Sequence, residues 1–259
     1  MVGISGLRAE DEIQVYTAEI NEVGKWSVQT HFNYALIGRK QPEVPGGLIP
    51  NHTLQGTPEF AYGVTPWFEF GIYIPYAVDR DGFHSNAGKL RFLFVTPDAA
   101  KLPFWYGVNF EIGYATKFFS EARWNMEIRP IIGWTFSDYE LVFNPIVEIG
   151  FGDKGDAIFT PAARFVRKIG KDFAIGLEYY ADLGPIGHWL PFREQGHNIY
   201  GVVDFKVAEV EVNFGIGYGF TEGSDRWMAK MILSKDIDYG ESKPNGTGSS
   251  GTVKRVVSK

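Results

Sequence analysis

Charged side chains recur along the middle of the chain, alternate with apolar residues, and largely change sign from one segment to the next. If these segments pack side by side, neighbouring charges lie about 4.8 Å apart laterally and form a ring. Such a ring is either a structural network that neutralises buried charge or a polar constriction that selects a solute. Because the signs nearly cancel, we predict weak ion selectivity or none. The residues of this predicted ring are Arg91, Glu111, Arg123, Glu127, Arg129, Glu148, Arg164 and Glu178.

The segment 184–196 is the best candidate for a gate over such a ring. Its Trp189, Leu190 and Phe192 could fold into the mouth and stack on an aromatic solute. The alternative is that these side chains pack against the long segment 35–53. The predicted gate residues are His188, Trp189, Phe192 and Arg193.

Four histidines fall in or beside the long connections of the chain. Several such residues at one mouth could collect a divalent metal. The chain has no cysteine, and we interpret these histidines as solvated loop residues, so that no metal site and no cofactor are predicted. They are His52, His84, His188 and His197.

The sequence offers no convincing catalytic pair. His31 alternates with Gln29 and Asn33 and is interpreted as a polar lining residue, and no serine is set opposite it as a nucleophile. Glu127 and Glu148 could be imagined as acid and base, but the neighbouring arginines make ion pairing the simpler account. We therefore predict that the protein is not an enzyme and assign no catalytic residues.

The elements that must position these side chains alternate with a period of two residues, which is the pattern of a β-strand with two different faces. About twelve such runs lie between Lys25 and Ile237, and helical periodicity is missing. No apolar run is long enough for a membrane-spanning helix. The first run places Trp26, Val28, Thr30, Phe32 and Tyr34 on one face and Ser27, Gln29, His31 and Asn33 on the other.

Twelve strands with wide aromatic faces favour a membrane barrel over a soluble sandwich or lipocalin-like barrel, in which about eight strands fill the interior. The connections alternate between longer and tighter, as in outer-membrane barrels with short periplasmic turns and long outer loops. We predict an all-β fold, a single antiparallel up-and-down transmembrane β-barrel of about 12 strands, in the bacterial outer membrane. Aromatic girdles are predicted at Trp26, Trp67, Trp105 and Trp134 on the periplasmic side and at Tyr34, Tyr76, Tyr114, Trp124 and Trp227 on the other.

Composition and charge limit the remaining organisation. The 259 residues carry a net charge of −6, which argues against nucleic acid as a partner. We expect an N-terminal lead over 1–24, the barrel over 25–237 and a disordered polar tail over 238–259. The start, 1–9, is either a remnant of a signal peptide or a short native N-terminus, and 11–24 is an extra strand, a periplasmic lead or a plug inside the lumen.

One segment resembles a known family. The run Glu59-Phe-Ala-Tyr-Gly-Val-Thr-Pro-Trp-Phe-Glu-Phe-Gly-Ile-Tyr-Ile-Pro-Tyr76 is similar to the strand, tight turn and strand of outer-membrane proteins grouped as the MetA-pathway phenol-degradation family, and Gly24 to Tyr34 resembles that group's first strand. The resemblance implies an outer-membrane β-barrel transporter linked to uptake of small aromatic compounds, and it supplies no catalytic residues. The chain departs from many such barrels by continuing about 20 polar residues past Ile237.

The sequence therefore predicts a channel or transporter for passive uptake of a small solute, with an aromatic compound as one candidate. The predicted partners are outer-membrane lipid and that solute. The alternatives are a plugged structural or adhesive barrel and, below it, a barrel lipid hydrolase. The sequence specifies neither the solute nor the oligomeric state.

Overall fold

The computed structural model describes residues 12–42, 44–85, 87–152 and 155–237. The predictions for 1–9 and for the tail 238–259 fall outside the described residues. Within them the structure has sixteen strands and one short 3-10 helix, η1 (Ala99–Lys101). The strands are β1 (Trp26–Ile37), β2 (Leu54–Thr65), β3 (Phe68–Tyr73), β4 (Tyr76–Asp79), β5 (Gly82–His84), β6 (Ala87–Val95), β7 (Phe104–Ala115), β8 (Trp124–Phe136), β9 (Tyr139–Asn144), β10 (Val147–Gly150), β11 (Ala157–Phe159), β12 (Ala162–Lys168), β13 (Phe173–Asp182), β14 (Gly196–Val207), β15 (Val210–Gly219) and β16 (Trp227–Ile237).

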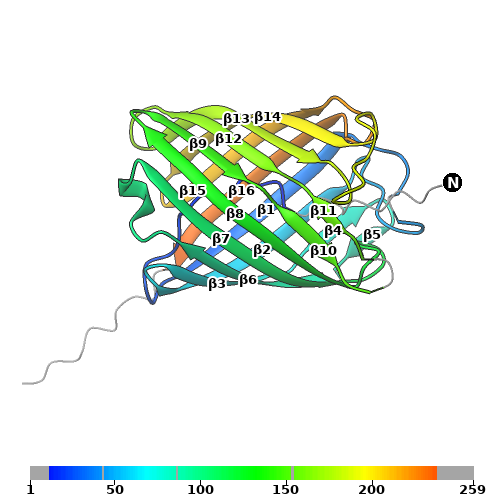
Figure 1. Ribbon diagram of the computed structural model, residues 1–259, viewed down its shortest axis with the longest axis horizontal. Coiled ribbons are helices and arrows are strands. Elements are labelled where there is room, and N and C mark those ends of the chain that lie inside the picture. Colours follow the sequence, from blue (N-terminus) through cyan, green and yellow to red (C-terminus); the bar gives the residue numbers. More distant parts are fainter. Residues whose placement is uncertain (1–11, 43, 86, 153–154, 238–259) are drawn as a thin grey trace, which may run out of the picture.

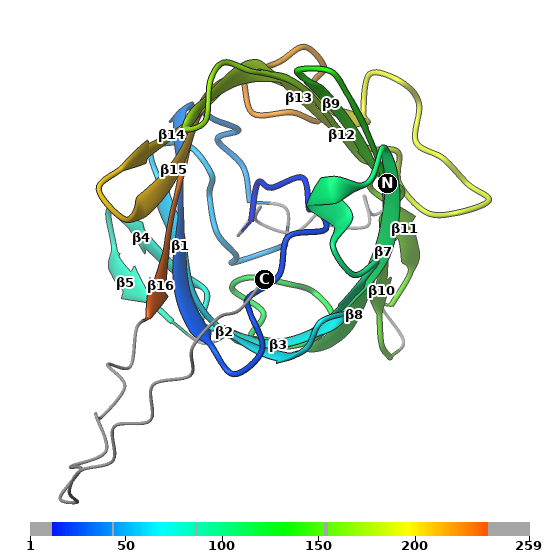
Figure 2. The same cartoon turned by 90° about the vertical axis from the view of Figure 1, so that its left-hand side faces the viewer.

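The strands close into a barrel because β1 pairs on both sides. Its Thr30 lies opposite Leu233 of β16 and opposite Pro58 of β2. Around the wall the order is β1, β16, β15, β14, β13, β12, β9, β8, β7, β6, β3 and β2, with every neighbouring pair antiparallel (Figures 1 and 2). The predicted single antiparallel barrel of about twelve strands is confirmed.

Three of the twelve wall positions are interrupted at prolines. Pro75 separates β3 from β4, Pro145 separates β9 from β10, and Pro161 separates β11 from β12. Proline has no backbone N–H to donate, so it ends regular pairing even where the chain continues in the same direction. The alternation of apolar and polar residues over 141–149 predicts one strand, but Pro145 divides this run into two strands in the structure.

Side chains alternate between a polar interior and an apolar exterior. In β8, Glu127 and Arg129 are buried, whereas Trp124 and Trp134 on the other face are exposed. Apolar side chains such as Leu177, which is 52% exposed, cover the outside. This is the inverse of a soluble barrel and the arrangement of an outer-membrane barrel.

Aromatic rings pair near the ends of the strands, as the predicted girdles require. Tyr114 and Trp124 have ring centroids 5.2 Å apart, and Tyr218 and Trp227 have centroids 5.0 Å apart. The assignment of Trp105 to a girdle is wrong. Its side chain is 3% exposed and packs inside the barrel, because it shares a face with the inward residues of β7 and not with the lipid-facing ones.

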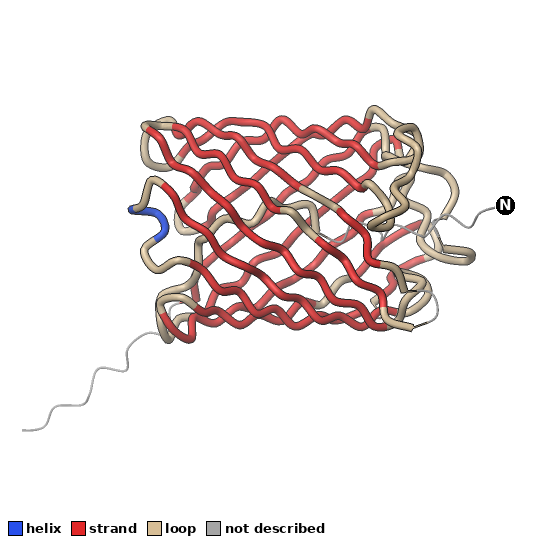
Figure 3. Tube along the Cα trace, in the orientation of Figure 1, coloured by secondary structure: helices blue, strands red, loops and turns tan. Residues whose placement is uncertain are grey.

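Tight hairpins gather at one end and longer loops at the other (Figure 3). At the tight end Ser137 and Ala208 have positive φ values of 53° and 55°, which allow the chain to reverse within two residues. Trp26 and Ile237 pair directly, so the wall begins and ends at this same end. Among the described residues no helix is long and apolar enough to cross a membrane.

Residues 12–23 precede β1 and lie inside the barrel, where Figure 2 shows them crossing the lumen. The side chains of Ile13, Val15, Tyr16 and Ala18 are buried there. We call residues 12–23 the lumenal segment. This is the location of a plug, one of the three alternatives that the sequence leaves open for this region.

Candidate solute path

The strand register brings four of the predicted ring residues into one row. Arg91 of β6 lies opposite Glu111 of β7, which lies opposite Glu127 of β8, which lies opposite Glu148 of β10. Three adjacent carboxylates in such a row would repel one another without cations. Each of these carboxylates therefore needs a cation or a hydrogen-bond donor of its own.

Arg91 serves two carboxylates, one from the neighbouring strand β3 and one from β2 beyond it. Its guanidinium lies 2.7 Å from a carboxylate oxygen of Glu59 and also donates to Glu69. Glu111 instead accepts from the side-chain amide of Asn109 at 2.9 Å and has Lys89 at 3.6 Å. All but Lys89 are at most 6% exposed, so these are buried pairs.

Arg129 neutralises the middle of the row. It donates to both oxygens of Glu127, from Nε at 2.6 Å and from a terminal nitrogen at 3.1 Å. The two residues are neighbours on the inward face of β8, so this pair can form within the strand and does not depend on closure of the barrel. Glu148 is half-buried and accepts from the hydroxyl of Thr160 at 3.3 Å.

A second charged cluster lies on the other side of the lumen, on β12 to β16. Arg164 donates to Glu178 at 2.6 Å and also to Asp204. Lys230, only 1% exposed, donates to the other oxygen of Glu178 and to the hydroxyl of Tyr180 at 3.2 Å. A buried ion pair is maintained only when such additional hydrogen bonds complete it.

The lumenal segment is held by both clusters through its backbone. The carbonyl of Ile13 accepts from Lys230 Nζ at 3.0 Å, and the carbonyl of Gln14 accepts from Arg129 at 2.9 Å. Asn144 holds Tyr16 twice: its Oδ1 accepts from the Tyr16 N–H at 2.7 Å, and its Nδ2 donates to the Tyr16 carbonyl at 3.1 Å. The backbone of an extended segment inside a barrel needs such partners in place of a neighbouring strand.

The side chain of Tyr16 is the most heavily engaged part of the segment. Its hydroxyl lies 2.5 Å from that of Tyr73 and donates to Glu111 at 3.2 Å. The guanidinium of Arg129 lies 4.1 Å from the centre of the ring, within cation–π range. The charged row therefore provides a site for one aromatic ring with a polar end, and the chain's own tyrosine fills it.

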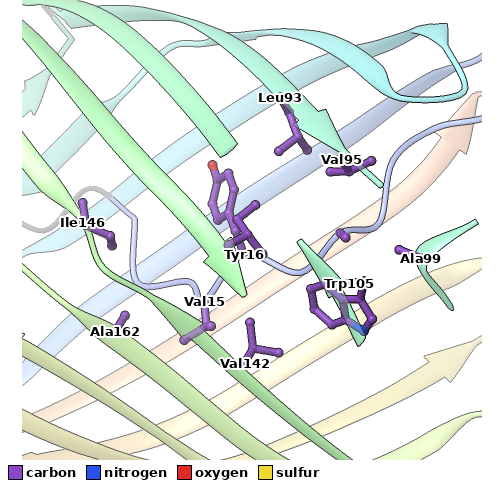
Figure 4. Close-up of a cluster of buried hydrophobic side chains, with 11 residues drawn as sticks. Val15, Tyr16, Leu93, Val95, Ala99, Trp105, Val142, Ile146 and Ala162 are labelled. Atoms are coloured by element: carbon purple, nitrogen blue, oxygen red, sulfur yellow. The ribbon is translucent and has the colours of Figure 1, made fainter. Parts of the chain in front are cut away.

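An apolar surface covers the wall beside this ring. Val15, Tyr16 and Ala18 pack against inward-facing residues of β6 to β9 and β12, and Figure 4 shows the side chains of Val15 and Tyr16 among them. The wall residues of this surface are Leu93, Val95, Trp105, Ile131, Val142, Ile146 and Ala162, with Ala99 beside them. We call the wall residues the lumenal apolar patch.

The segment meets the wall again before β1 begins. The Asn21 N–H donates to Glu69 at 2.6 Å, and Val23 forms a parallel bridge to Gly63 of β2. A Cβ on residue 63 would lie 2.4 Å from the carbonyl oxygen of Glu22, so glycine is the residue that permits this approach.

The structure does not bring every predicted ring residue into this network. Arg123 precedes β8 and is exposed. Arg123 is separated from the inward-facing Glu127 and Arg129 by an even number of residues, which predicts that it also faces inward. It lies beyond the end of β8, however, and side chains alternate between the two faces only within the strand. Arg91, Glu111, Glu127, Arg129, Arg164 and Glu178 do lie in the lumen, in the two clusters described, and Glu148 is paired in register with Glu127.

The predicted gate loop lies on the outer side of the wall. Its backbone bonds to β11, where Ile186 N–H donates to the Ala157 carbonyl at 2.8 Å, and to the next loop, where Arg193 pairs with Glu222. Phe192 packs on His197 with ring centroids 4.8 Å apart, and Trp189 is 62% exposed. His188 lies on the same loop, and Figure 2 shows this segment projecting beyond the barrel.

A different loop reaches across the mouth. Leu48, from the segment between β1 and β2, is buried against Ala77, Ala115 and Phe119, and its N–H donates to the Phe118 carbonyl at 2.9 Å. This loop, and not 184–196, contacts the opposite rim. Among the described residues, no group of three or more His, Cys, Asp or Glu side chains is placed to hold a metal ion.

Several residues of the network were missed by the sequence analysis. Glu59, Glu69 and Tyr73 alternate with Phe60, Phe68 and other lipid-facing residues, so the two-residue period already placed them on the polar face. The sequence pattern could not predict the contact between Asn144 and Tyr16, because the two residues are 128 positions apart.

Comparison with known proteins supports the fold. The chain matches no protein-family model and no curated protein, so the resemblance to the MetA-pathway group is not confirmed. Among solved structures it is similar to the COG4313 outer membrane channel from Pseudomonas putida F1, with 13% identity and a TM-score of 0.57 over 87% of this chain and 100% of that chain. It is also similar to the KdgM porin, with 11% identity and a TM-score of 0.54 over 82% and 99% of the two chains, and to the NanC porin, with 7% identity and a TM-score of 0.52 over the same shares.

At these identities the likeness establishes the fold. The apolar exterior, the polar lumen and these neighbours agree with the predicted location in the bacterial outer membrane. This chain has the closed β-barrel fold of outer-membrane porins and channels.

Proposed function

We propose that this protein is an outer-membrane channel for passive uptake of a small solute, and that the lumenal segment closes it in the state described here. The observation that carries the proposal is the way the segment is held. Its backbone and one tyrosine ring bond to charged and amide side chains of the wall, which would otherwise face the lumen.

We infer that the solute combines an apolar or aromatic part with a polar end. The lumenal apolar patch and the Arg129 guanidinium together accept the ring of Tyr16, while Tyr73 and Glu111 bind its hydroxyl. A phenol-like solute would find the same partners once Tyr16 leaves. This chemistry agrees with the resemblance to the MetA-pathway group, and membership of that group is part of the proposal.

A plugged structural barrel is the second candidate, because the same segment would keep the lumen closed if it never left. A lipid hydrolase has less support. His31, on which such an activity would depend, lies within the lumen beside Gln29 at 2.8 Å and Glu59 at 3.9 Å. We accordingly propose no catalytic role for this barrel.

Single-channel recording of the refolded protein in planar bilayers tests the proposal. Tyr16→Ala removes the ring and hydroxyl contacts of the segment, so the open time should increase over that of the wild type. Tyr106→Ala is the matched control, since Tyr106 is 62% exposed on the lipid-facing side. Silence from both the wild type and Tyr16→Ala, with folding verified, would favour the structural barrel.

A further inference from the structure

The outer face of the wall has a groove at the tight end, between β16 and the hairpin that joins β14 to β15. The ladder between β15 and β16 begins at Glu211↔Ser234, so residues 235–237 of β16 pair with β1 and not with β15. The hairpin itself stays paired out to Val207↔Val210. Figure 2, which looks at this end of the barrel, shows the hairpin leaving the wall beside the end of β16.

The groove has a volume of about 560 Å³ and an apolar floor. The floor comes from Val28 of β1, Val210 of β15 and Leu233 of β16. Val28 shares a strand face with Trp26, and Leu233 shares one with Trp227, so the groove opens towards the lipid and not towards the lumen. We call it the hairpin groove.

Three charged side chains line the hairpin groove: Lys235, Glu209 and Asp236. Nζ of Lys235 lies 3.4 Å from a carboxylate oxygen of Glu209, and the two side chains are 54% and 76% exposed. An ion pair as exposed as this contributes little to stability, so a ligand can separate the two groups at little cost. Two carboxylates and one ammonium give the groove a formal charge of −1.

The charged end of the groove lies at the depth of the lipid headgroups. Ile237, which also lines the groove, pairs directly with Trp26, and the ring of Trp26 lies 4.9 Å from that of Tyr62. Tryptophan and tyrosine gather where a membrane meets water. The apolar floor runs from this end towards the middle of the wall, because Val28 lies opposite Lys235, and Leu233 lies two residues further in.

We propose that the hairpin groove binds one phospholipid whose headgroup carries both a phosphate and a primary ammonium group, as phosphatidylethanolamine does. Lys235 binds the phosphate, Glu209 and Asp236 accept from the N–H groups of the ammonium, and an acyl chain lies on the apolar floor. The inference concerns the outer face of the wall and does not depend on the proposed channel function.

The same three charges select against other phospholipids. Phosphatidylglycerol offers a phosphate to Lys235 but no N–H, and its negative charge meets the two carboxylates of Glu209 and Asp236. The ammonium of phosphatidylcholine has no N–H to donate. Vesicles of phosphatidylcholine should therefore leave the pair between Lys235 and Glu209 as it is.

Native mass spectrometry of the refolded protein in detergent micelles tests the proposal, with phosphatidylethanolamine, phosphatidylglycerol and phosphatidylcholine of the same acyl chains as probes. The wild type should bind one phosphatidylethanolamine about tenfold more tightly than either other lipid. Glu209→Gln/Asp236→Asn should remove this preference, because both acceptors lose their charge. Lys235→Met should weaken the binding of phosphatidylethanolamine and of phosphatidylglycerol.

Two further variants separate the groove from surface charge in general. Lys101→Met is the matched control, because Lys101 forms an exposed pair with Asp98 at 2.6 Å at the same end of the barrel but outside the groove, and it should bind lipid as the wild type does. Val210→Trp fills the apolar floor without changing a charge and should reduce phosphatidylethanolamine binding about tenfold. Heat-induced mobility shifts in gels verify that each barrel is folded.

Equal affinity of the wild type for the three lipids would overturn the proposal. A preference for phosphatidylethanolamine that survives in Glu209→Gln/Asp236→Asn would also overturn it, as would unchanged binding in folded Val210→Trp. Equal losses in Lys101→Met and Lys235→Met would mean that lipid responds only to the charge of the surface, and would overturn the groove as a site. None of these results bears on conductance, so the channel proposal is tested separately.

Discussion

Lys230 shows how a charge is maintained inside this barrel. It has almost no solvent contact, yet it donates to Glu178, to Tyr180 and to the carbonyl of Ile13. Each of its three N–H groups therefore has a partner. Glu178 and Tyr180 belong to β13, and Ile13 belongs to the lumenal segment. The residue connects the wall network to the lumenal segment.

We expect Lys230→Met to destabilise the barrel by about 3 kcal/mol, the lower end of what removing one partner of a buried pair costs, since Arg164 still serves Glu178. Urea unfolding in lipid vesicles, followed by tryptophan fluorescence, measures this. Lys235→Met is the control, because Lys235 and Glu209 form an exposed pair at 3.4 Å that should contribute roughly 0–1 kcal/mol. Equal losses in the two variants would contradict the assignment.

Asn144 holds the lumenal segment with both ends of its amide. Asn144→Ala should weaken docking of the segment by about 1–3 kcal/mol, which speeds amide exchange over residues 13–18 by roughly one to two orders of magnitude. Hydrogen exchange with mass spectrometry measures the change. Asn125→Ala, at another buried lumenal asparagine, should leave these amides slow, and fast exchange in both variants would argue against a specific anchor.

At the scale of elements, the lumenal segment depends on a close approach to β2. The Gly24 N–H donates to the Gly63 carbonyl at 2.8 Å, and the Gly63 N–H donates to the Lys25 carbonyl at 3.0 Å. This exchange attaches the end of the segment to the wall just before β1 begins. Because the atoms around Gly63 are backbone, they cannot move aside as a flexible side chain would.

We expect Gly63→Ala to displace residues 21–24 at a cost of about 1–3 kcal/mol, as overpacking does elsewhere. Faster tryptic cleavage after Lys25, measured by mass spectrometry, reports the displacement. Gly201→Ala is the matched control, because a Cβ at residue 201 would meet nothing within 4 Å. Unchanged cleavage in Gly63→Ala would show that the segment does not need this contact.

At the scale of the whole molecule, cations pair with carboxylates on both sides of the lumen. Arg91 and Arg129 serve one side, and Arg164 and Lys230 serve the other. Each of these cations lies against at least one carboxylate, so most of the charge that faces a permeating ion is paired. Weak ion selectivity, which the sequence suggests, therefore remains a prediction, and this pairing of charges is its structural basis.

Reversal potentials in a KCl gradient should lie near zero for the wild type and shift towards cation selectivity in Arg91→Met, which leaves Glu59 and Glu69 without their guanidinium. Arg193→Met is the control, since Arg193 lies in an outer loop against Glu222. A strongly selective wild type, or an equal shift in both variants, would disprove the prediction.

The sequence by itself determined the wall. Alternation such as that from Trp26 to Tyr34 is a local property, because successive side chains of a strand point to opposite faces whatever the rest of the chain does. It therefore predicted the strands, their inward charges and the barrel class. The same alternation places Glu59, Glu69 and Trp105 on the inward face, although the two glutamates were not predicted as lumenal residues and Trp105 was predicted to lie in a girdle.

Only the tertiary structure decided what these residues meet. Arg91 reaches Glu59 because closure of the barrel sets the register between strands, and Tyr16 meets Asn144 because the lumenal segment threads a space that exists only after closure. The outward course of 184–196 likewise depends on loop packing. A two-residue period fixes the face of a side chain but not its height, and contacts inside a barrel depend on both.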